Sequence, residues 1–335
     1  TLSTMHGCPP DEIERIASYL IEERRYHTAV KLNPTLLGPD RLREILNNRG
    51  YNRIDVPEQA FEHDLKYEDA VGMIRSLRDR AKQASVDFGL KLTNTLEVIN
   101  KRKALPEDQE HLYLSGEALH PLTVNIADKL QEEFDGELDL SFSGGATALN
   151  TPDLIAAGLS PVTVCTDILR PGGYLRLAQY VNELRDKFKS SGAESLSELL
   201  AAGPGGSARE NLRLYAQAVS APLGEEAEHR PSLSMKTSRK LPRFDCASAP
   251  CVQSCAIDQA IPDYLHWAEQ QNLDAAWRTV LRTNPLPHIT GMVCDHLCMT
   301  RCTRVHYEDP ILIRDVKRYI AESAVQTVPK PLAGN

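Results

Sequence analysis

The sequence has 335 residues, of which 41% are hydrophobic and 25% charged, and its formal net charge is -8. This composition excludes disorder as the default state, and the acidic balance argues against a nucleic-acid partner or an anionic membrane surface. No apolar run reaches the roughly 20 residues of a membrane span. No secretory signal opens the chain, so we expect a cytoplasmic protein that is long enough for two domains.

The first 190 residues alternate short apolar runs with amphipathic stretches. Strands are predicted at residues 28–33, 53–56, 88–94, 112–115, 138–143 and 162–166. Apolar side chains at three- and four-residue spacing predict helices at residues 12–23, 68–83, 123–134, 152–157 and 175–188. Strand-helix alternation predicts a parallel sheet with helical crossovers, which closes as a barrel or stays an open doubly wound sheet.

Polar or glycine-rich residues follow several predicted strands, among them Asn33, Asn94, Gly116, Gly144 and Thr166. In a (β/α)8 barrel these strand ends form the active-site face, although strand termination and helix capping also favour such residues. A full barrel needs about 250 residues. The strand-helix pattern changes before residue 190, so we expect a partial (β/α)8 TIM-type barrel at 1–190 that lacks its first strands.

The rest of the chain divides into three segments. Residues 191–239 have the composition of a linker, with short helices predicted at 194–202 and 208–219. Residues 240–326 are predicted to form a small all-α domain, with helices at 261–270, 273–282 and 311–324. Residues 327–335 have the composition of an inter-domain linker. The first residue is Thr1 rather than methionine, so we expect a fragment of a longer chain.

Six of the eight cysteines lie in the helical part, in two groups: Cys246, Cys251 and Cys255, then Cys294, Cys298 and Cys302. Thiolates at this density are typical of iron-sulfur clusters or zinc. Cysteines four residues apart on a helix project to one side and can share a metal site. A single site takes four ligands, so six cysteines predict two sites that other groups complete.

The residues around these cysteines carry a resemblance. The run Cys246-Ala-Ser-Ala-Pro-Cys251-Val-Gln-Ser-Cys255 precedes Ile261-Pro262, Asn284-Pro285-Leu286 and Gly291-Met292-Val293-Cys294. This pattern resembles the two-cluster domain of dihydropyrimidine dehydrogenase and the small subunit of glutamate synthase. The resemblance implies up to two [4Fe-4S] clusters, and it assigns the ligands to them as Cys246, Cys251 and Cys302 for one, and Cys255, Cys294 and Cys298 for the other.

Two positions depart from the family's pattern. Arg243 stands where the family has a further cysteine, and Lys317 stands where a Gln or Glu from the last helix completes the second cluster. The fourth ligand of each site is therefore open. Four further side chains lie within sequence reach: Asp245, Asp295, His296 and His306.

The first domain resembles the flavin barrel of the dihydroorotate dehydrogenase type. Val30-Lys31-Leu32-Asn33-Pro34 matches the strand whose lysine lies against FMN, and Thr93-Asn94-Thr95 matches a segment that contacts substrate. Cys8 lies close to the position of the family's active-site cysteine, which implies a catalytic role as proton donor. The resemblance implies FMN in the barrel, with contacts from Lys31, Asn94, Gly116, Gly144, Gly145 and Thr166.

The order of the two domains resembles the bacterial selenate reductase iron-sulfur subunit family, in which an FAD and NAD(P)H module follows. No Gly-x-Gly-x-x-Gly motif occurs here, so we expect that module outside these residues. The resemblance implies an oxidoreductase that passes electrons from the module through the clusters to the barrel or to a partner subunit.

Two alternatives stay open. The first is a zinc-stiffened interaction scaffold without enzymatic activity, which Arg243 and Lys317 favour because they replace expected ligands. The second is a cofactor-free barrel lyase that uses Lys31 or Lys91 as a Schiff-base nucleophile, since a desolvated lysine at a strand end suits that role.

Overall fold

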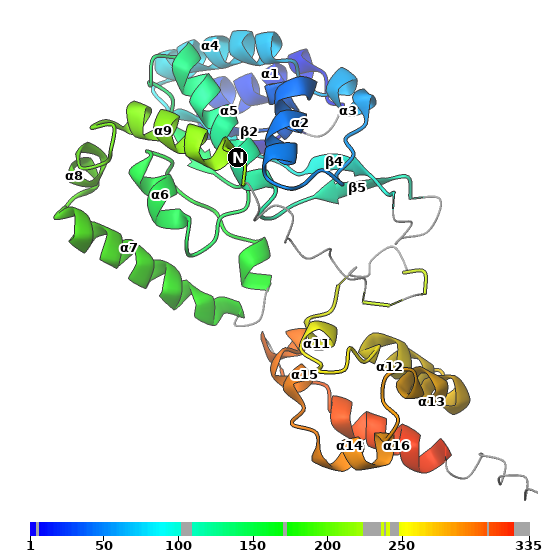
Figure 1. Ribbon diagram of the computed structural model, residues 1–335. Coiled ribbons are helices and arrows are strands. Elements are labelled where there is room, and N and C mark those ends of the chain that lie inside the picture. The colour runs from blue at the N-terminus through cyan, green and yellow to red at the C-terminus, as the bar shows by residue number, and fades with distance from the viewer. Residues whose placement is uncertain are drawn as a thin grey trace, which may run out of the picture. The chain divides into compact units, whose positions relative to one another are not determined.

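The computed structural model describes residues 1–4, 7–101, 109–169, 173–223, 236–237, 239–241, 248–306 and 308–324. These residues form two compact units. The first takes its described residues from 1–101, 110–168 and 174–230, and we call it the barrel unit. We call the second, whose helices follow residue 231, the helical unit (Figure 1). Among the described residues, no helix is both long enough and apolar enough to cross a membrane.

Four parallel strands form the centre of the barrel unit, in the order β1 (Leu2–Ser3), β2 (Thr28–Leu32), β3 (Phe88–Leu92) and β6 (Leu140–Phe142). Val162 extends this sheet by one parallel bridge to Phe142. One face of the sheet is buried and apolar, with Val30, Leu90 and Phe142 at most 1% exposed. Alternate residues of a strand point to opposite faces, which explains this spacing.

Helices cover the buried face, as Figure 1 shows for α1, α4 and α5. The helical segments of the unit are α1 (Pro10–Ser18), the π-helical turn η1 (Tyr19–Glu23), the 3-10 turn η2 (Pro34–Leu37), α2 (Pro39–Asn48), α3 (Glu58–His63), α4 (Tyr67–Ala84), α5 (Leu119–Glu133), α6 (Thr151–Ala156), η3 (Thr166–Leu169), η4 (Gly173–Arg176), α7 (Leu177–Ser191), α8 (Leu196–Ala201) and α9 (Ala208–Ser220). Helices thus connect the parallel strands, as the sequence pattern predicts.

The opposite face of the sheet carries a row of polar side chains. Ser3, Lys31, Lys91 and Ser141 lie side by side in register across the four strands, and each remains at least partly exposed. In a closed barrel, alternate residues of every strand point into the interior. This row therefore marks the inward-facing side of the partial barrel.

Three strand predictions need correction. Of residues 162–166, only Val162 pairs, through its single bridge to Phe142. Residues 53–56 form no strand; Pro57 follows them and has no backbone N-H, and Asp55 O accepts one hydrogen bond from Ile99 N at 2.9 Å. The strand predicted at 112–115 is β5 (His111–Leu114), which pairs antiparallel with β4 (Leu96–Ile99) outside the parallel sheet. The two form a separate hairpin.

The predicted linker contains two helices of the barrel unit. Ser195 and Ser207 cap α8 and α9, because each side chain accepts a hydrogen bond from the backbone N-H three residues later. Leu212 and Ala216 of α9 join the core of the unit. Asn125 of α5 donates to Ser220 Oγ at 2.7 Å, which fastens α9 to α5. The barrel unit therefore continues beyond residue 190.

The helical unit contains only helices among its described residues: α11 (Pro250–Gln253), α12 (Ile261–Glu269), α13 (Leu273–Leu281), α14 (Pro287–Val293), α15 (Leu297–Thr300), η5 (Thr303–His306) and α16 (Ile313–Ala324). Proline stands in the first turn of α11, α12 and α14, where its missing N-H costs no helical hydrogen bond. Ile261, Tyr264, Val280 and Ile320 form its small core.

Candidate metal centre and barrel strand ends

Short helices and the turns after them position five cysteines in the helical unit. Cys251 lies in α11 and Cys298 in α15, and these two helices pack against each other. Cys255, Cys294 and Cys302 each lie within two residues of the end of a short helix. All five are free thiols, and Cys298 and Cys302 are buried. The sixth predicted ligand, Cys246, lies outside the described residues, as do Arg243 and Asp245.

Three of the cysteines line one cavity of about 180 Å³, which we call the Lys317 cavity. Cys255, Cys294 and Cys298 lie on its wall together with Lys317 of α16. Lys317 is 7% exposed, and its Nζ lies 3.4 Å from Cys294 Sγ. The structure thus brings together the three cysteines that the resemblance assigns to one cluster and the lysine that replaces its fourth ligand.

The remaining described cysteines lie close to this group. Burial, followed by the neighbouring Cys298 and Cys302, raises the pKa of Cys251 to about 11. Burial also raises the pKa of Cys298, as do Cys255 and Cys294, while the Lys317 charge opposes that rise. Thiols with raised pKa values stay protonated at neutral pH unless a cation compensates them, and metal binding supplies that compensation.

Two buried polar atoms on the wall of the Lys317 cavity have no hydrogen-bond partner in the described part of the chain. One is Gln259 Oε1, whose side chain is 2% exposed and whose Nε2 already donates to Val280 O at 3.0 Å. The other is His296 Nδ1. Buried acceptors are usually paired, so these atoms indicate that the cavity is built to hold a polar or charged group.

Asp295 and His296, two of the open candidates for a fourth ligand, also line this cavity. The structure does not describe the side chain of His306.

The spacing of the thiols bears on the kind of metal. No three His, Cys, Asp or Glu side chains among the described residues converge closely enough to hold a single metal ion. Four thiolates on one zinc ion lie roughly 3.8 Å apart, given a Zn–S distance of about 2.3 Å. In a [4Fe-4S] cluster the cysteines bind different irons, so they need not converge on a point. The donor set fits a cluster better than a single zinc ion.

The lysines of the barrel unit lie on the inward-facing row. Lys31 of β2 is in register with Lys91 of β3. Partial burial and then the charge of Lys91 lower the pKa of Lys31, and the nearby Cys165 opposes this effect. Lys31, Lys91 and Cys165 therefore face one another across the ends of adjacent strands.

The Asn94 side chain is committed to local contacts. Its Nδ2 donates to Asn33 Oδ1 and to the carbonyl oxygen of Thr4, both at 2.7 Å. These bonds tie together the carboxyl ends of β1, β2 and β3. The predicted contact of the Asn94 amide with a ligand would have to replace them.

Gly116, Gly144, Gly145 and Thr166 do lie together, but the glycines pack against protein atoms. A Cβ at Gly144 would lie 2.2 Å from Thr123 Oγ1, and one at Gly145 would lie 2.4 Å from the Gly116 carbonyl oxygen. A Cβ at Gly116 would lie 3.1 Å from Thr166 Cγ2. Close packing of two loops therefore accounts for these three glycines.

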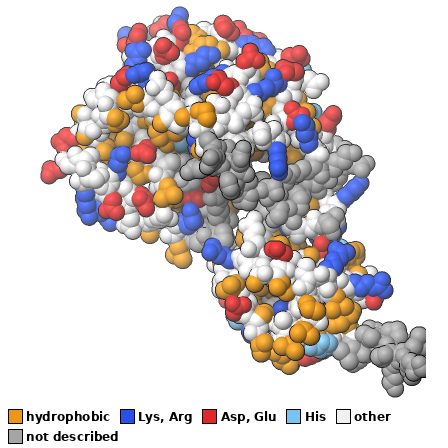
Figure 2. Space-filling model, viewed as in Figure 1, with side chains coloured by type: hydrophobic (Ala, Val, Ile, Leu, Met, Phe, Trp, Pro, Cys, Tyr) orange, Lys and Arg blue, Asp and Glu red, His pale blue; other side chains and the backbone are white. Residues whose placement is uncertain are grey.

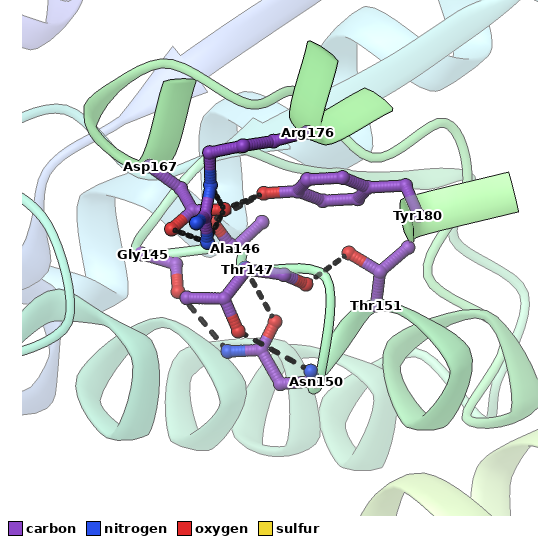
Figure 3. A network of polar contacts seen from close by, with 8 residues as sticks. All are labelled: Gly145, Ala146, Thr147, Asn150, Thr151, Asp167, Arg176 and Tyr180. Atoms are coloured by element: carbon purple, nitrogen blue, oxygen red, sulfur yellow. Dashed lines mark hydrogen bonds and ion pairs between the residues drawn. The ribbon is translucent and has the colours of Figure 1, made fainter. Parts of the chain in front are cut away.

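A polar network that the sequence does not reveal holds the same loops together (Figure 3). Asp167 is 3% exposed and accepts hydrogen bonds from Arg176 Nη2 at 2.9 Å and from Tyr180 OH at 2.6 Å. Asn150 donates to Gly145 O at 3.1 Å. The one feature of the sequence that points to this network is the polar pair Thr166-Asp167, which follows a predicted strand.

The positions that the resemblance assigns to FMN also make contacts within the protein. Protein atoms lie close to where a Cβ of each glycine would stand, Asn94 Nδ2 donates to Asn33 Oδ1, and the Asp167 carboxylate accepts from Arg176. A flavin phosphate needs backbone N-H groups and cations that face open space. FMN in the barrel stays a prediction from the resemblance, and we derive no step through a flavin there.

Cys8 lies just before α1, and its thiol is 4.0 Å from Glu12 Oε2. Burial and the carboxylates of Glu12 and Asp11 raise its pKa. The thiol is therefore protonated at neutral pH, as a proton donor must be, but nothing among the described residues places a substrate beside it.

The sequence matches two family models. Residues 1–203 match the oxidoreductase YgfK N-terminal TIM-barrel domain, and residues 230–328 match dihydropyrimidine dehydrogenase domain II, 4Fe-4S cluster. These matches confirm the predicted order of a TIM-type barrel and a helical iron-sulfur domain.

Three relatives illustrate the similarity. YgfK of Escherichia coli (strain K12), a candidate oxidoreductase, is 43% identical over 322 residues, which are 96% of this chain and 30% of the relative. The NADPH-Fe(3+) oxidoreductase subunit beta of Geobacter sulfurreducens is 30% identical over 94 residues, which are 26% of this chain and 14% of that protein. The glutamate synthase [NADPH] small chain of Halomonas elongata is 32% identical over 81 residues, 24% of this chain and 17% of that one. The chain thus spans about a third of YgfK.

Proposed function

Because the chain belongs to the YgfK oxidoreductase family, we propose that it is the barrel and iron-sulfur part of a larger oxidoreductase and that its helical unit relays electrons. Clusters of the [4Fe-4S] type supply one-electron carriers whose potential the protein tunes. The observation that carries the proposal is the Lys317 cavity, where three thiols, two unpartnered polar atoms and a buried ammonium meet.

The chain's own residues would hold the clusters in two sets. Cys255, Cys294 and Cys298 would bind one from the wall of the Lys317 cavity. Cys251, Cys302 and Cys246 would bind the other, as the resemblance implies. Cys298 of the first set and Cys302 of the second are buried, which shields these two sulfurs from water and lowers the local dielectric.

We propose that the electron donor is an FAD and NAD(P)H module in the remainder of a longer polypeptide. Two relatives that match the helical unit carry NADPH in their names, and both are subunits of larger enzymes.

Figure 2 shows hydrophobic side chains gathered over the helical unit. Exposed apolar residues of this kind suit packing against another protein surface; they include Leu286, Ile289, Met292, Val293, Leu297 and Leu312.

The acceptor belongs to the same proposal. The electrons would pass from the clusters to the barrel or to a partner subunit, as the resemblance implies. The likeness to a selenate reductase, FMN in the barrel, the role of Cys8 and a cytoplasmic location stay predictions from the sequence and its resemblance.

Anaerobic production with iron supplied tests the proposal. We expect iron and acid-labile sulfide to co-purify, with visible absorbance that dithionite bleaches. Cys298→Ser should lower the iron content, whereas Cys165→Ser should leave it unchanged, because Cys165 is an exposed thiol of the barrel unit. A colourless protein that holds zinc and no iron would contradict the proposal and favour the scaffold.

A further inference from the structure

The last helix offers a cation where the resemblance predicts a ligand. Lys317 is almost completely buried, and the contact of its ammonium is Cys294 Sγ at 3.4 Å. No carboxylate pairs with Lys317 in the part of the chain that the structure describes. A buried ammonium without a counter-charge costs several kcal/mol, so an anion at Cys294 is the partner that this position requires.

A second cation of the same helix points to the same cysteine. Arg314 lies one turn before Lys317 and donates from Nη1 to the carbonyl oxygen of Cys294 at 3.1 Å. Both residues line the Lys317 cavity. Helix α16 therefore directs two positive charges at Cys294, one at its backbone and one at its sulfur.

We infer that Lys317 is a positioning residue that donates an N-H···S hydrogen bond to the Cys294 thiolate and raises the reduction potential of the cluster bound there, rather than serving as its fourth ligand. The inference rests on the proposed function, since it requires a cluster on Cys255, Cys294 and Cys298. An ammonium that donates its protons to sulfur has no lone pair to give to iron.

The sign of the effect follows from charge. Reduction adds one electron to the cluster, so a nearby positive charge stabilises the reduced form more than the oxidised form. Hydrogen bonds to the sulfurs act in the same direction, as outer-shell contacts do at metal sites in general. Loss of the ammonium should therefore make the cluster harder to reduce.

The experiment is a redox titration of the full chain, reconstituted with iron and sulfide under anaerobic conditions and followed by electron paramagnetic resonance. Lys317→Met removes the charge and keeps the length of the side chain. At the wild-type midpoint potential we expect the ratio of reduced to oxidised cluster to fall about tenfold, which corresponds to a shift of about 59 mV for one electron. Lys317→Arg keeps the positive charge, so its reduction potential should lie close to that of the wild type.

Arg318→Met is the matched control. It removes one positive charge from the neighbouring residue of the same helix, but Arg318 is exposed and pairs with Glu322 at 2.7 Å outside the cavity. The reduction potential of the cluster in Arg318→Met should match that of the wild type. Should Lys317→Met fail to fold, Lys317→Leu offers a second side chain with neither charge nor N-H donor, and its cluster should again have a lower reduction potential than that of the wild type.

The outcomes separate the inference from the proposed function. A wild-type chain that takes up no cluster would contradict the proposed function. Clusters that form in the wild type and in Lys317→Met with equal potentials overturn the inference alone. A three-iron signal in Lys317→Met, with wild-type iron content in Arg318→Met, also overturns it, because it would show that Lys317 binds iron directly.

Discussion

His120 is a buried titratable group whose environment controls its charge. It lies in the first turn of α5, and its Nε2 is 2.9 Å from Tyr215 OH. Its ring also packs edge-on against Phe142 and Tyr215. Burial, and to a lesser degree the charge of Arg49, lower the pKa of His120 from 6.5 to about 4. The folded barrel unit therefore holds this histidine neutral.

This environment predicts a loss of stability in mild acid. The folded pKa of His120 lies below the unfolded value, so the unfolded chain binds the proton first as the pH falls below 6.5. The free energy of unfolding of the barrel unit should fall by roughly 3 kcal/mol between about pH 6.5 and pH 4. Urea unfolding at a series of pH values measures this free energy. In His120→Gln it should depend much less on pH over the same pH range.

The Asp167 network makes a second prediction. Arg176→Ala removes a cation that contacts the Asp167 carboxylate, whose side chain is 2% exposed. Breaking a buried ion pair costs about 3–5 kcal/mol, and the partial exposure of Arg176 reduces this to about 2 kcal/mol. Arg185→Ala on the same helix removes an exposed guanidinium and should change the unfolding midpoint in urea very little. Equal midpoints for the two variants would contradict a stabilising role for the network.

The network shows what sequence patterns miss at this scale. Thr166 and Asp167 stand out as polar residues after a strand, but their partners Arg176 and Tyr180 look like ordinary surface residues. They meet Asp167 because they lie four residues apart, so that both point from the start of α7 toward one carboxylate. Only the path of the chain between residues 167 and 176 brings them there.

At the level of elements, two glycines in helices make opposite predictions. A Cβ at Gly291 of α14 would lie 3.0 Å from Arg318 Cα, because α14 and α16 pack closely there. Overpacking costs about 1–3 kcal/mol, which exceeds the roughly 1 kcal/mol that alanine gains in a helix. We expect Gly291→Ala to lower the melting temperature of the helical unit.

Gly72 of α4 provides the comparison. A Cβ at this exposed glycine would meet nothing within 4 Å. Gly72→Ala should therefore stabilise the barrel unit by about 0.5–1 kcal/mol through helix propensity and a less flexible unfolded chain. Thermal unfolding of both variants measures the contrast. A stabilised Gly291→Ala would mean that α14 and α16 can move apart at little cost.

Local patterns predicted β2, β3 and β6 because their apolar residues alternate toward one covered face. They did not predict the β4–β5 hairpin, because β4 follows β3 after only three residues and reads as its continuation. The family resemblance grouped Cys255, Cys294 and Cys298, and these three line one cavity. The sequence did not predict the burial of Lys317, which depends on how α14 packs against α16.

At the scale of the whole molecule, each unit has its own hydrophobic core. If the helical unit binds clusters as proposed, their removal should destabilise that unit and leave the other unchanged, because a ligand stabilises only the fold that binds it. We expect two thermal transitions in the reconstituted chain. An iron chelator under oxidising conditions should lower the melting temperature of the helical unit only. A single transition whose melting temperature shifts as a whole would contradict the independence of the two units.

Tyr264 has a consequence for how such a chain would take up electrons. Its ring is 1% exposed, and it lies within electrostatic reach of Cys251 as well as of Cys255, Cys294 and Cys298. Cysteines assigned to two different clusters thus surround one buried aromatic ring. Charge added to the cluster on one side of that ring would interact with the cluster on the other side. The two clusters would therefore be reduced as a coupled pair, and the observed potentials would belong to the pair and not to either cluster alone. The first electron would make the second harder to add, and the chain would release electrons one at a time.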